Sequence, residues 1–196
     1  MSSEPTHIIA CAVFKPVLDQ LALKVRFPDL RVTFLPANLH VNPAKLYDYI
    51  HWVTQLSQQR GERIIFLYGE CFPDFCGFSE KHNAMKVTGT SCYEMLLGKE
   101  QFRRILDETA GTYFLERSLI EDFERCCAEP LELHDREMRE CIFNHYRRLI
   151  YVRQSSDPDL ISRVSRLADF LELELEIRDA DYSHIERELT DLIESP

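Results

Sequence analysis

Long apolar runs are missing from this sequence, since no stretch approaches the ~20 apolar residues that a membrane-spanning helix requires. Residues Met1 to Pro5 lack the basic start and apolar core of a signal peptide, so we expect a cytosolic location. Basic residues are also few: 23 Lys and Arg face 33 Asp and Glu, for a formal net charge of −10. This charge argues against nucleic-acid binding, which needs a clustered basic face, and against binding to anionic membranes.

Several catalytic signatures are missing as well. The sequence holds no Walker loop, no GxGxxG after its first apolar run, no HExxH and no GxSxG. Nucleotide-dependent and serine-hydrolase functions therefore lose their usual support. What is present is ordinary for a globular fold, with 45% hydrophobic and 29% charged residues. A length of 196 residues suits one domain spanning residues 1–196.

Short apolar runs alternate with amphipathic stretches along the whole chain, and each run predicts a buried strand. The main predicted strands are Ile8–Val13, Val32–Leu35, Arg63–Tyr68, Leu149–Val152 and Leu173–Ile177. Shorter runs at Met85–Val87 and Gly111–Leu115 are weaker strand candidates. The alternation predicts a single Rossmann-like α/β domain, with a mostly parallel sheet and helices on both faces.

The helices carry recognisable start signals. Asn42 is a good N-cap and Pro43 a good first residue for a helix that continues to Gln59. A further helix is predicted from Cys92 to about Thr109. Ser183 is predicted to cap the last helix, with Glu186 three residues later completing a capping box.

Seven cysteines are the chemically notable residues, and in a reducing cytosol disulfides are not expected. Cys11, Cys71 and Cys92 each lie at or just after the end of a predicted strand. Parallel strands bring their carboxyl ends to one edge of the sheet, where ligands bind. Three thiolates there would hold a zinc ion, or a four-iron cluster with one open position. The alternative is that each cysteine packs as a small buried hydrophobe, and spacing alone does not decide between the two.

Other residues complete the candidate site or stand outside it. Cys76 and His40 are reserves for a fourth ligand, while Glu70 and Glu94 flank two of the candidate cysteines. Glu70, Glu94 and His40 are the weak candidates for proton transfer, and no catalytic residue is assigned. The remaining cysteines lie in helical stretches and are expected to be structural or incidental: Cys126, Cys127 and Cys141.

A succession of short motifs resembles an uncharacterised domain family of methanogens and other anaerobes, often encoded beside corrinoid-dependent methyltransferases. The motifs are Ile8-Ile9-Ala10-Cys11, Leu35-Pro36-Ala37-Asn38-Leu39-His40-Val41-Asn42-Pro43, Leu67-Tyr68-Gly69-Glu70-Cys71, Ser91-Cys92-Tyr93-Glu94-Met95-Leu96-Leu97-Gly98 and Gly111-Thr112-Tyr113. The chain resembles a divergent member, because Ser91 replaces an expected aspartate and a Gly-Trp after Tyr113 is missing.

The resemblance implies a shared metal site at Cys11, Cys71 and Cys92. It favours an oxygen-sensitive iron–sulfur (4Fe–4S) cluster over zinc, and it points to methyl-transfer metabolism with a corrinoid protein or methyltransferase as partner. Two other functions stay open: a zinc-thiolate methyltransferase, and a non-catalytic scaffold whose acidic surface docks a basic protein.

Overall fold

The computed structural model describes residues 5–195, and these residues form two compact units. Unit 1 contains residues 5–95 and 182–195, and unit 2 contains residues 96–181. The domain expected over residues 1–196 therefore contains two units. Within residues 5–195, no helix combines the length and the apolar character that crossing a membrane requires.

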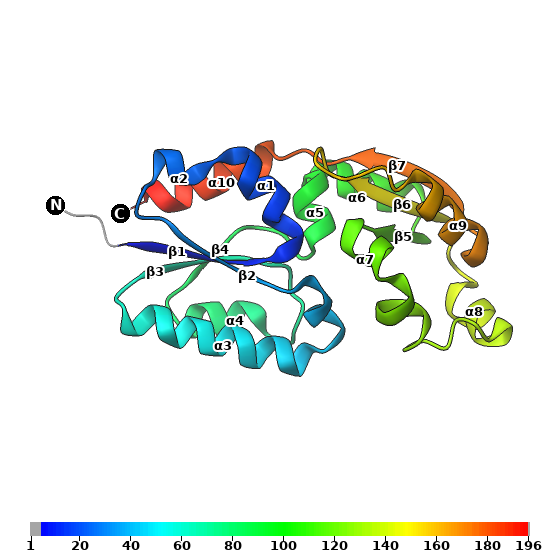
Figure 1. The fold of residues 1–196 in the computed structure, drawn as a ribbon, viewed down its shortest axis with the longest axis horizontal. Helices are drawn as coiled ribbons and strands as arrows, with labels where there is room; N and C mark the ends of the chain where they lie inside the picture. The colour runs from blue at the N-terminus through cyan, green and yellow to red at the C-terminus, as the bar shows by residue number, and fades with distance from the viewer. Residues whose placement is uncertain (1–4, 196) are drawn as a thin grey trace. The chain divides into compact units, whose positions relative to one another are not determined.

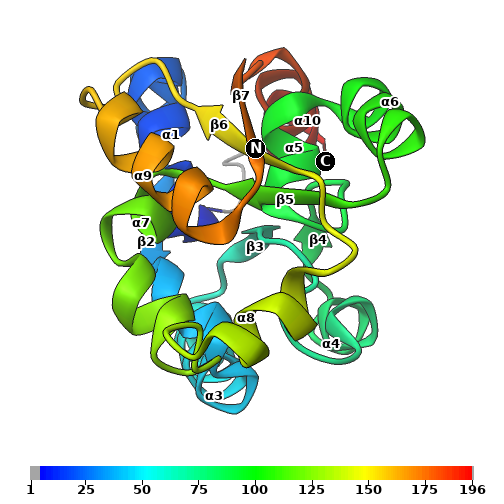
Figure 2. The same cartoon turned by 90° about the vertical axis from the view of Figure 1, so that its right-hand side faces the viewer.

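Unit 1 is built on a parallel four-stranded sheet in the order β2-β1-β3-β4. Its strands are β1 (Thr6–Cys11), β2 (Arg31–Leu35), β3 (Arg63–Leu67) and β4 (Met85–Lys86). Helices cover both faces of this sheet, as Figure 1 and Figure 2 show. One face carries α1 (Lys15–Leu21), α2 (Leu23–Arg26) and α10 (Ser183–Glu194), and the other carries α3 (Pro43–Gln59) and α4 (Phe75–Lys81).

The core of unit 1 follows from the alternation of side chains along its strands. Ile9, Ile64 and Phe66 point to the α3 and α4 side and join one buried cluster there. Aromatic rings fill much of that cluster, with Phe66 and Phe75 packed edge to face at a centroid distance of 5.3 Å. Because both faces are buried, the strands read as continuous apolar runs rather than as alternating ones.

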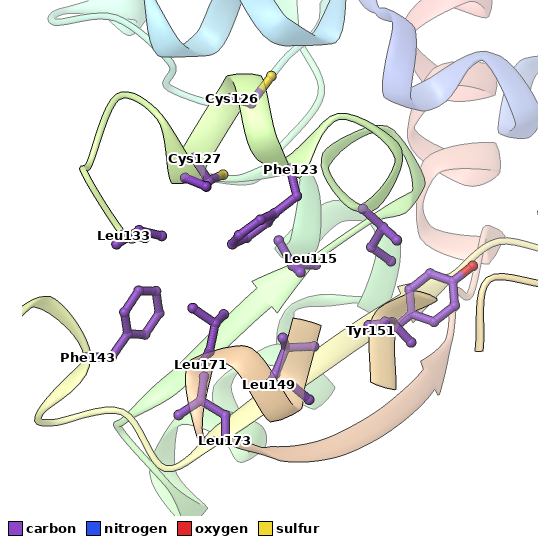
Figure 3. Close-up of a cluster of buried hydrophobic side chains, with 14 of the residues drawn as sticks. Leu115, Phe123, Cys126, Cys127, Leu133, Phe143, Leu149, Tyr151, Leu171 and Leu173 are labelled. Atoms are coloured by element: carbon purple, nitrogen blue, oxygen red, sulfur yellow. The ribbon is translucent and has the colours of Figure 1, made fainter. Parts of the chain in front are cut away.

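Unit 2 is built on a parallel three-stranded sheet in the order β5-β6-β7. The strands are β5 (Thr112–Leu115), β6 (Arg148–Arg153) and β7 (Glu174–Asp179). Four helical segments contribute to the buried cluster on one face, drawn in Figure 3: α7 (Arg117–Glu121), the π-helix η3 (Glu124–Ala128), α8 (Arg136–Phe143) and α9 (Ile161–Leu171). Phe102 of α6 (Lys99–Glu108) meets Phe114 of β5, with ring centroids 5.3 Å apart.

The predicted parallel α/β architecture is confirmed, whereas the prediction of one central sheet is wrong. β6 and β7 belong to the sheet of unit 2 and do not pair with β1, β2 or β3. Each sheet packs against its own apolar cluster. The alternation of strands and helices along a chain is the same for one large sheet and two smaller ones, so it does not give their number.

The helix predictions are partly right. The side chain of Asn42 accepts a hydrogen bond of 3.1 Å from the amide of Lys45, so the predicted cap of α3 is confirmed. The helix expected from Cys92 to Thr109 is interrupted at Gly98, whose φ of +79° cannot continue a right-handed helix. Ser183 is the first helical residue of α10 rather than its cap, which lies at Tyr182.

Candidate metal-binding site

The three candidate cysteines follow three neighbouring strands of the sheet in unit 1. Cys11 is the last residue of β1, Cys71 lies in the loop after β3, and Cys92 follows β4 as the first residue of α5 (Cys92–Leu97). Because the strands are parallel, their carboxyl ends share one edge of the sheet. The predicted convergence of these strand ends is therefore found within unit 1.

A switch in strand order lies at the same edge. From β1 the chain passes to β2 on one side and then returns to β3 on the other. Ligands of open α/β sheets bind in the crevice outside the carboxyl ends of the strands at such a switch. Cys11 and Cys71 come from the two strands that flank it.

The loop that carries Cys71 touches the segment that leads to Cys92. The amide of Glu70 donates a hydrogen bond of 2.9 Å to the carbonyl oxygen of Thr90. Gly69 lies so close that an added Cβ would be 3.0 Å from Cα of Ser91 and 3.3 Å from the amide nitrogen of Cys92. Only a residue without a side chain fits there, which accounts for the glycine after Tyr68.

Tyr68 is a shared neighbour of Cys11 and Cys71. Its side chain is buried, and its pKa is raised well above the usual range by burial and by the neighbouring thiols of Cys11 and Cys71. Cys11 and Cys71 also pack against the same apolar cluster that contains Tyr68. The thiols of Cys11 and Cys71 are therefore both neighbours of the buried Tyr68 hydroxyl and do not lie in separate regions of the unit.

The polarity around Cys71 is set by Lys86 of β4. Burial raises the pKa of the Cys71 thiol, and the positive charge of Lys86 opposes that shift. The ammonium group donates a 2.7 Å hydrogen bond to the carbonyl oxygen of Gly89 and lies 3.8 Å from a carboxylate oxygen of Glu70. The role of Lys86 beside Cys71 was not predicted from the sequence. A lysine inside a short strand between two cysteine-bearing loops could have indicated a charge close to the thiols.

The reserve ligands and flanking acids have partners of their own. The exposed thiol of Cys76 donates to Glu70 at 3.5 Å, and Nδ1 of His40 lies 2.7 Å from the carbonyl oxygen of Ala37. Glu94 accepts hydrogen bonds from the amide and the hydroxyl of Thr90, at 2.8 and 2.7 Å. Glu94 thus fixes the turn before α5, on which Cys92 lies.

The sulfur atoms are not gathered into a finished ligand set. Across residues 5–195, the structure has no group of three or more His, Cys, Asp or Glu side chains arranged to hold a metal ion. All three candidate thiols are nevertheless half-buried, so none is hidden in the core and none is freely exposed. The ligand assignment stays a prediction, and what the fold supplies is the common edge, the contacting loops and the shared neighbour.

The remaining three cysteines belong to unit 2. Cys126 and Cys127 are both 7% exposed and both pack into the apolar cluster of Figure 3. Adjacent residues such as these do not share one face of a regular α-helix. They lie instead in the π-helix, which has a wider turn, and both are buried. Cys141 of α8 is exposed.

Comparisons with known proteins identify a family for this chain but no individual relative. Neither the curated proteins nor the solved structures contain a relative that matches this chain. The family described as "Protein of unknown function (DUF1638)" matches residues 34–189, which include Cys71, Cys92 and most of both units. Since the match extends over far more than half of the sequence, the chain belongs to the DUF1638 family.

Proposed function

We propose that this protein is a cytosolic metal-binding protein that holds a cysteine-ligated centre at Cys11, Cys71 and Cys92. The observation that carries the proposal is the position of the switch in strand order, between the strands that lead to Cys11 and Cys71. Gly69 also lies close to the backbone just before Cys92, so the segment that carries the third thiol lies at the same edge of the sheet.

The donor set favours an iron–sulfur cluster. Thiolates are the ordinary ligands of such clusters, and three of them leave one iron without a protein ligand. When bound, an open iron would supply Lewis acidity or a port for electrons. In this proposal the protein supplies the three sulfurs, the Lys86 charge beside Cys71, and a partly buried setting. Closing the set requires the three cysteines to move closer together, since the sulfurs are not gathered as they stand.

The metabolic part of the proposal depends on the sequence motifs rather than on the site geometry. Their resemblance to proteins encoded near corrinoid-dependent methyltransferases favours a role in one-carbon, methyl-transfer metabolism. A corrinoid protein or a methyltransferase is then the expected partner. The alternative function, a zinc-thiolate methyltransferase, would use the same three cysteines. It differs from the iron–sulfur proposal in the metal and in the chemistry at the open position.

Metal and sulfide analysis of protein purified without oxygen tests the proposal. We expect a brown protein with about four iron and four sulfide per chain. Cys11→Ser, Cys71→Ser and Cys92→Ser should each lose most of the iron, whereas the matched variant Cys141→Ser, at an exposed position in unit 2, should keep it.

A colourless protein with about one zinc per chain, lost in the same three variants, would support the zinc-thiolate alternative. Folded, anaerobically purified protein without stoichiometric metal would overturn both metal proposals and leave the scaffold function. Far-ultraviolet circular dichroism of each variant separates loss of metal from loss of fold.

A further inference from the structure

Two histidines outside the cysteine edge lie against each other on the α3 and α4 side of unit 1. His51 belongs to α3, and His82 is the residue at which α4 ends. Their ring centroids are 5.4 Å apart, with an angle of 64° between the ring planes. The two helices that carry them are shown below the sheet in Figure 1.

One nitrogen of this pair lacks a partner. Nδ1 of His82 lies 3.4 Å from the side-chain oxygen of Gln58, and the side-chain amide of Gln58 donates back to the His82 carbonyl at 3.1 Å. With its proton on Nδ1, the ring presents a lone pair on Nε2. That atom is buried and has no hydrogen-bond partner among the described residues. A buried acceptor without a donor is rare, and it calls for a water molecule or an ion.

A neutral imidazole binds a metal ion through the lone pair of its unprotonated nitrogen. The Gln58 contact also matches a general feature of metal-binding histidines, which donate their second ring N–H to a fixed acceptor.

The spacing fits one shared ion. Imidazole nitrogens lie about 2.0–2.1 Å from zinc, and a tetrahedral angle between two of them places the ring centroids ~5 Å apart. The observed 5.4 Å is close to that value. Phe78 packs against both rings, at centroid distances of 6.0 Å from His51 and 4.5 Å from His82, and so holds them in place.

We propose that His51 and His82 form a second metal site, which binds a borderline divalent ion such as Zn²⁺ with water in the remaining positions. The ion joins α3 to the end of α4 and supplies the missing partner of His82 Nε2. Gln58 is a positioning residue for this site, because it fixes the tautomer and the orientation of the His82 ring. The site shares no residue with the cysteine edge.

The only tryptophan of the chain provides a local probe. Trp52 is adjacent to His51 in α3 and is 58% exposed. Cobalt(II), a paramagnetic ion that accepts tetrahedral sites, should quench Trp52 fluorescence when it binds beside His51. We expect saturable quenching in the full-length protein, reversed by Zn²⁺, which binds such ligands more strongly than cobalt and has a filled d shell.

Variants decide whether the quenching reports this site. His51→Gln and His82→Gln should each abolish saturable quenching, and Gln58→Ala should weaken cobalt binding by about tenfold. The control His145→Gln, at an exposed histidine in unit 2, should behave as the parent. Quenching should also persist in a variant with Cys11, Cys71 and Cys92 changed to serine, which separates this site from the cysteine centre.

Saturable quenching that survives in both histidine variants, or that disappears with the cysteines alone, would overturn the site. No saturable quenching of the parent at millimolar cobalt would overturn it as well. A variant that fails to fold is replaced by a competition measurement on the parent, in which alkylation of the imidazoles must be slowed by Zn²⁺ at both His51 and His82.

Discussion

The amide of Glu70 donates a 2.9 Å hydrogen bond to the carbonyl oxygen of Thr90, which joins the loop after β3 to the segment before α5. The two residues are distant in sequence, yet this bond brings the segment that bears Cys71 against the segment that bears Cys92. The contact is tight because Gly69 precedes Glu70 and leaves room for the neighbouring backbone.

Gly69→Ala should destabilise unit 1 and disturb the cysteine edge. The new Cβ would lie 3.0 Å from Cα of Ser91 and 3.1 Å from the carbonyl oxygen of Thr90, and backbone atoms cannot move aside cheaply. We expect a loss of roughly 1–3 kcal/mol in the free energy of unfolding, measured by urea denaturation, together with a lower metal content.

The control for this substitution is Gly61→Ala, whose Cβ meets no atom within 4 Å. Gly61 has a φ of +65°, so its replacement should cost about 1 kcal/mol through backbone strain alone. Metal content should then stay at the level of the parent. Equal loss of metal in both variants would show that the effect is general rather than local to Gly69.

Acidification should destabilise unit 1 through His7. This residue is fully buried at the amino-terminal half of β1, where Arg31 donates to Nδ1 at 2.8 Å and Thr33 lies 2.8 Å from Nε2. Burial, followed by the charge of Arg31, lowers its pKa from 6.5 to about 4. The unfolded chain therefore binds the proton more readily than the folded one throughout that interval.

Unit 1 should therefore lose stability as the pH falls, because the unfolded chain gains the His7 proton first. Neutral His7 makes its full contribution to the free energy of unfolding above pH 6.5. That contribution is lost as the pH falls towards 4, and the loss amounts to up to about 3 kcal/mol. Glu62, which is ion-paired with Arg31, has a lowered pKa and adds a loss in the same direction below its ordinary pKa of 4.5.

Urea denaturation at a series of pH values checks the His7 prediction. His7→Gln should flatten the dependence of the free energy of unfolding between pH 6.5 and 4, whatever its effect on overall stability. His145→Gln should keep the parental slope, because His145 is exposed. A slope unchanged by His7→Gln would rule out His7 as its source.

Asp157→Ala should destabilise unit 2 by roughly 1–3 kcal/mol, because it removes the acceptor of a buried hydroxyl. The carboxylate of Asp157 accepts hydrogen bonds from the Tyr151 hydroxyl at 2.7 Å and from the Gln154 amide at 2.9 Å. Tyr151 is fully buried, so its hydroxyl would be left without this partner.

A double-mutant cycle isolates that interaction. Tyr151→Phe in the Asp157→Ala background should cost less than Tyr151→Phe in the parent, because the hydroxyl no longer has its acceptor. Denaturation of the four proteins provides the measurement. Strictly additive effects would contradict a direct contribution of the Tyr151 to Asp157 hydrogen bond.

Replacement of Cys127 by Ala should reduce stability without changing metal content. Cys127 is buried in the cluster of Figure 3 and accepts a hydrogen bond from the Tyr113 hydroxyl at 3.7 Å. A packing loss of about 1–3 kcal/mol is expected, whereas Cys141→Ala should stay within about 0.5 kcal/mol of the parent. Loss of metal from a folded Cys127→Ala protein would move the metal site away from the cysteine edge of unit 1.

The local elements could be predicted from short stretches of sequence. Apolar runs such as Ile64-Ile65-Phe66-Leu67 specify buried strands because every residue of such a strand faces a covered side of the sheet. Asn42 and Pro43 determine the start of α3 through one side-chain hydrogen bond and one fixed φ angle. The placement of cysteines after strands could also be predicted, because it depends only on the positions of strand ends.

Strand pairing and the contacts between distant side chains could not be predicted in this way. β6 and β7 could have extended the first sheet as far as their sequences show, but their hydrogen bonds go to β5 and to each other. The same holds for Tyr68 beside Cys11 and Cys71, for Lys86 beside Cys71, and for His51 against His82. These relationships depend on backbone pairing and packing between distant segments, whereas periodicity and capping describe a residue only with its near neighbours in the chain.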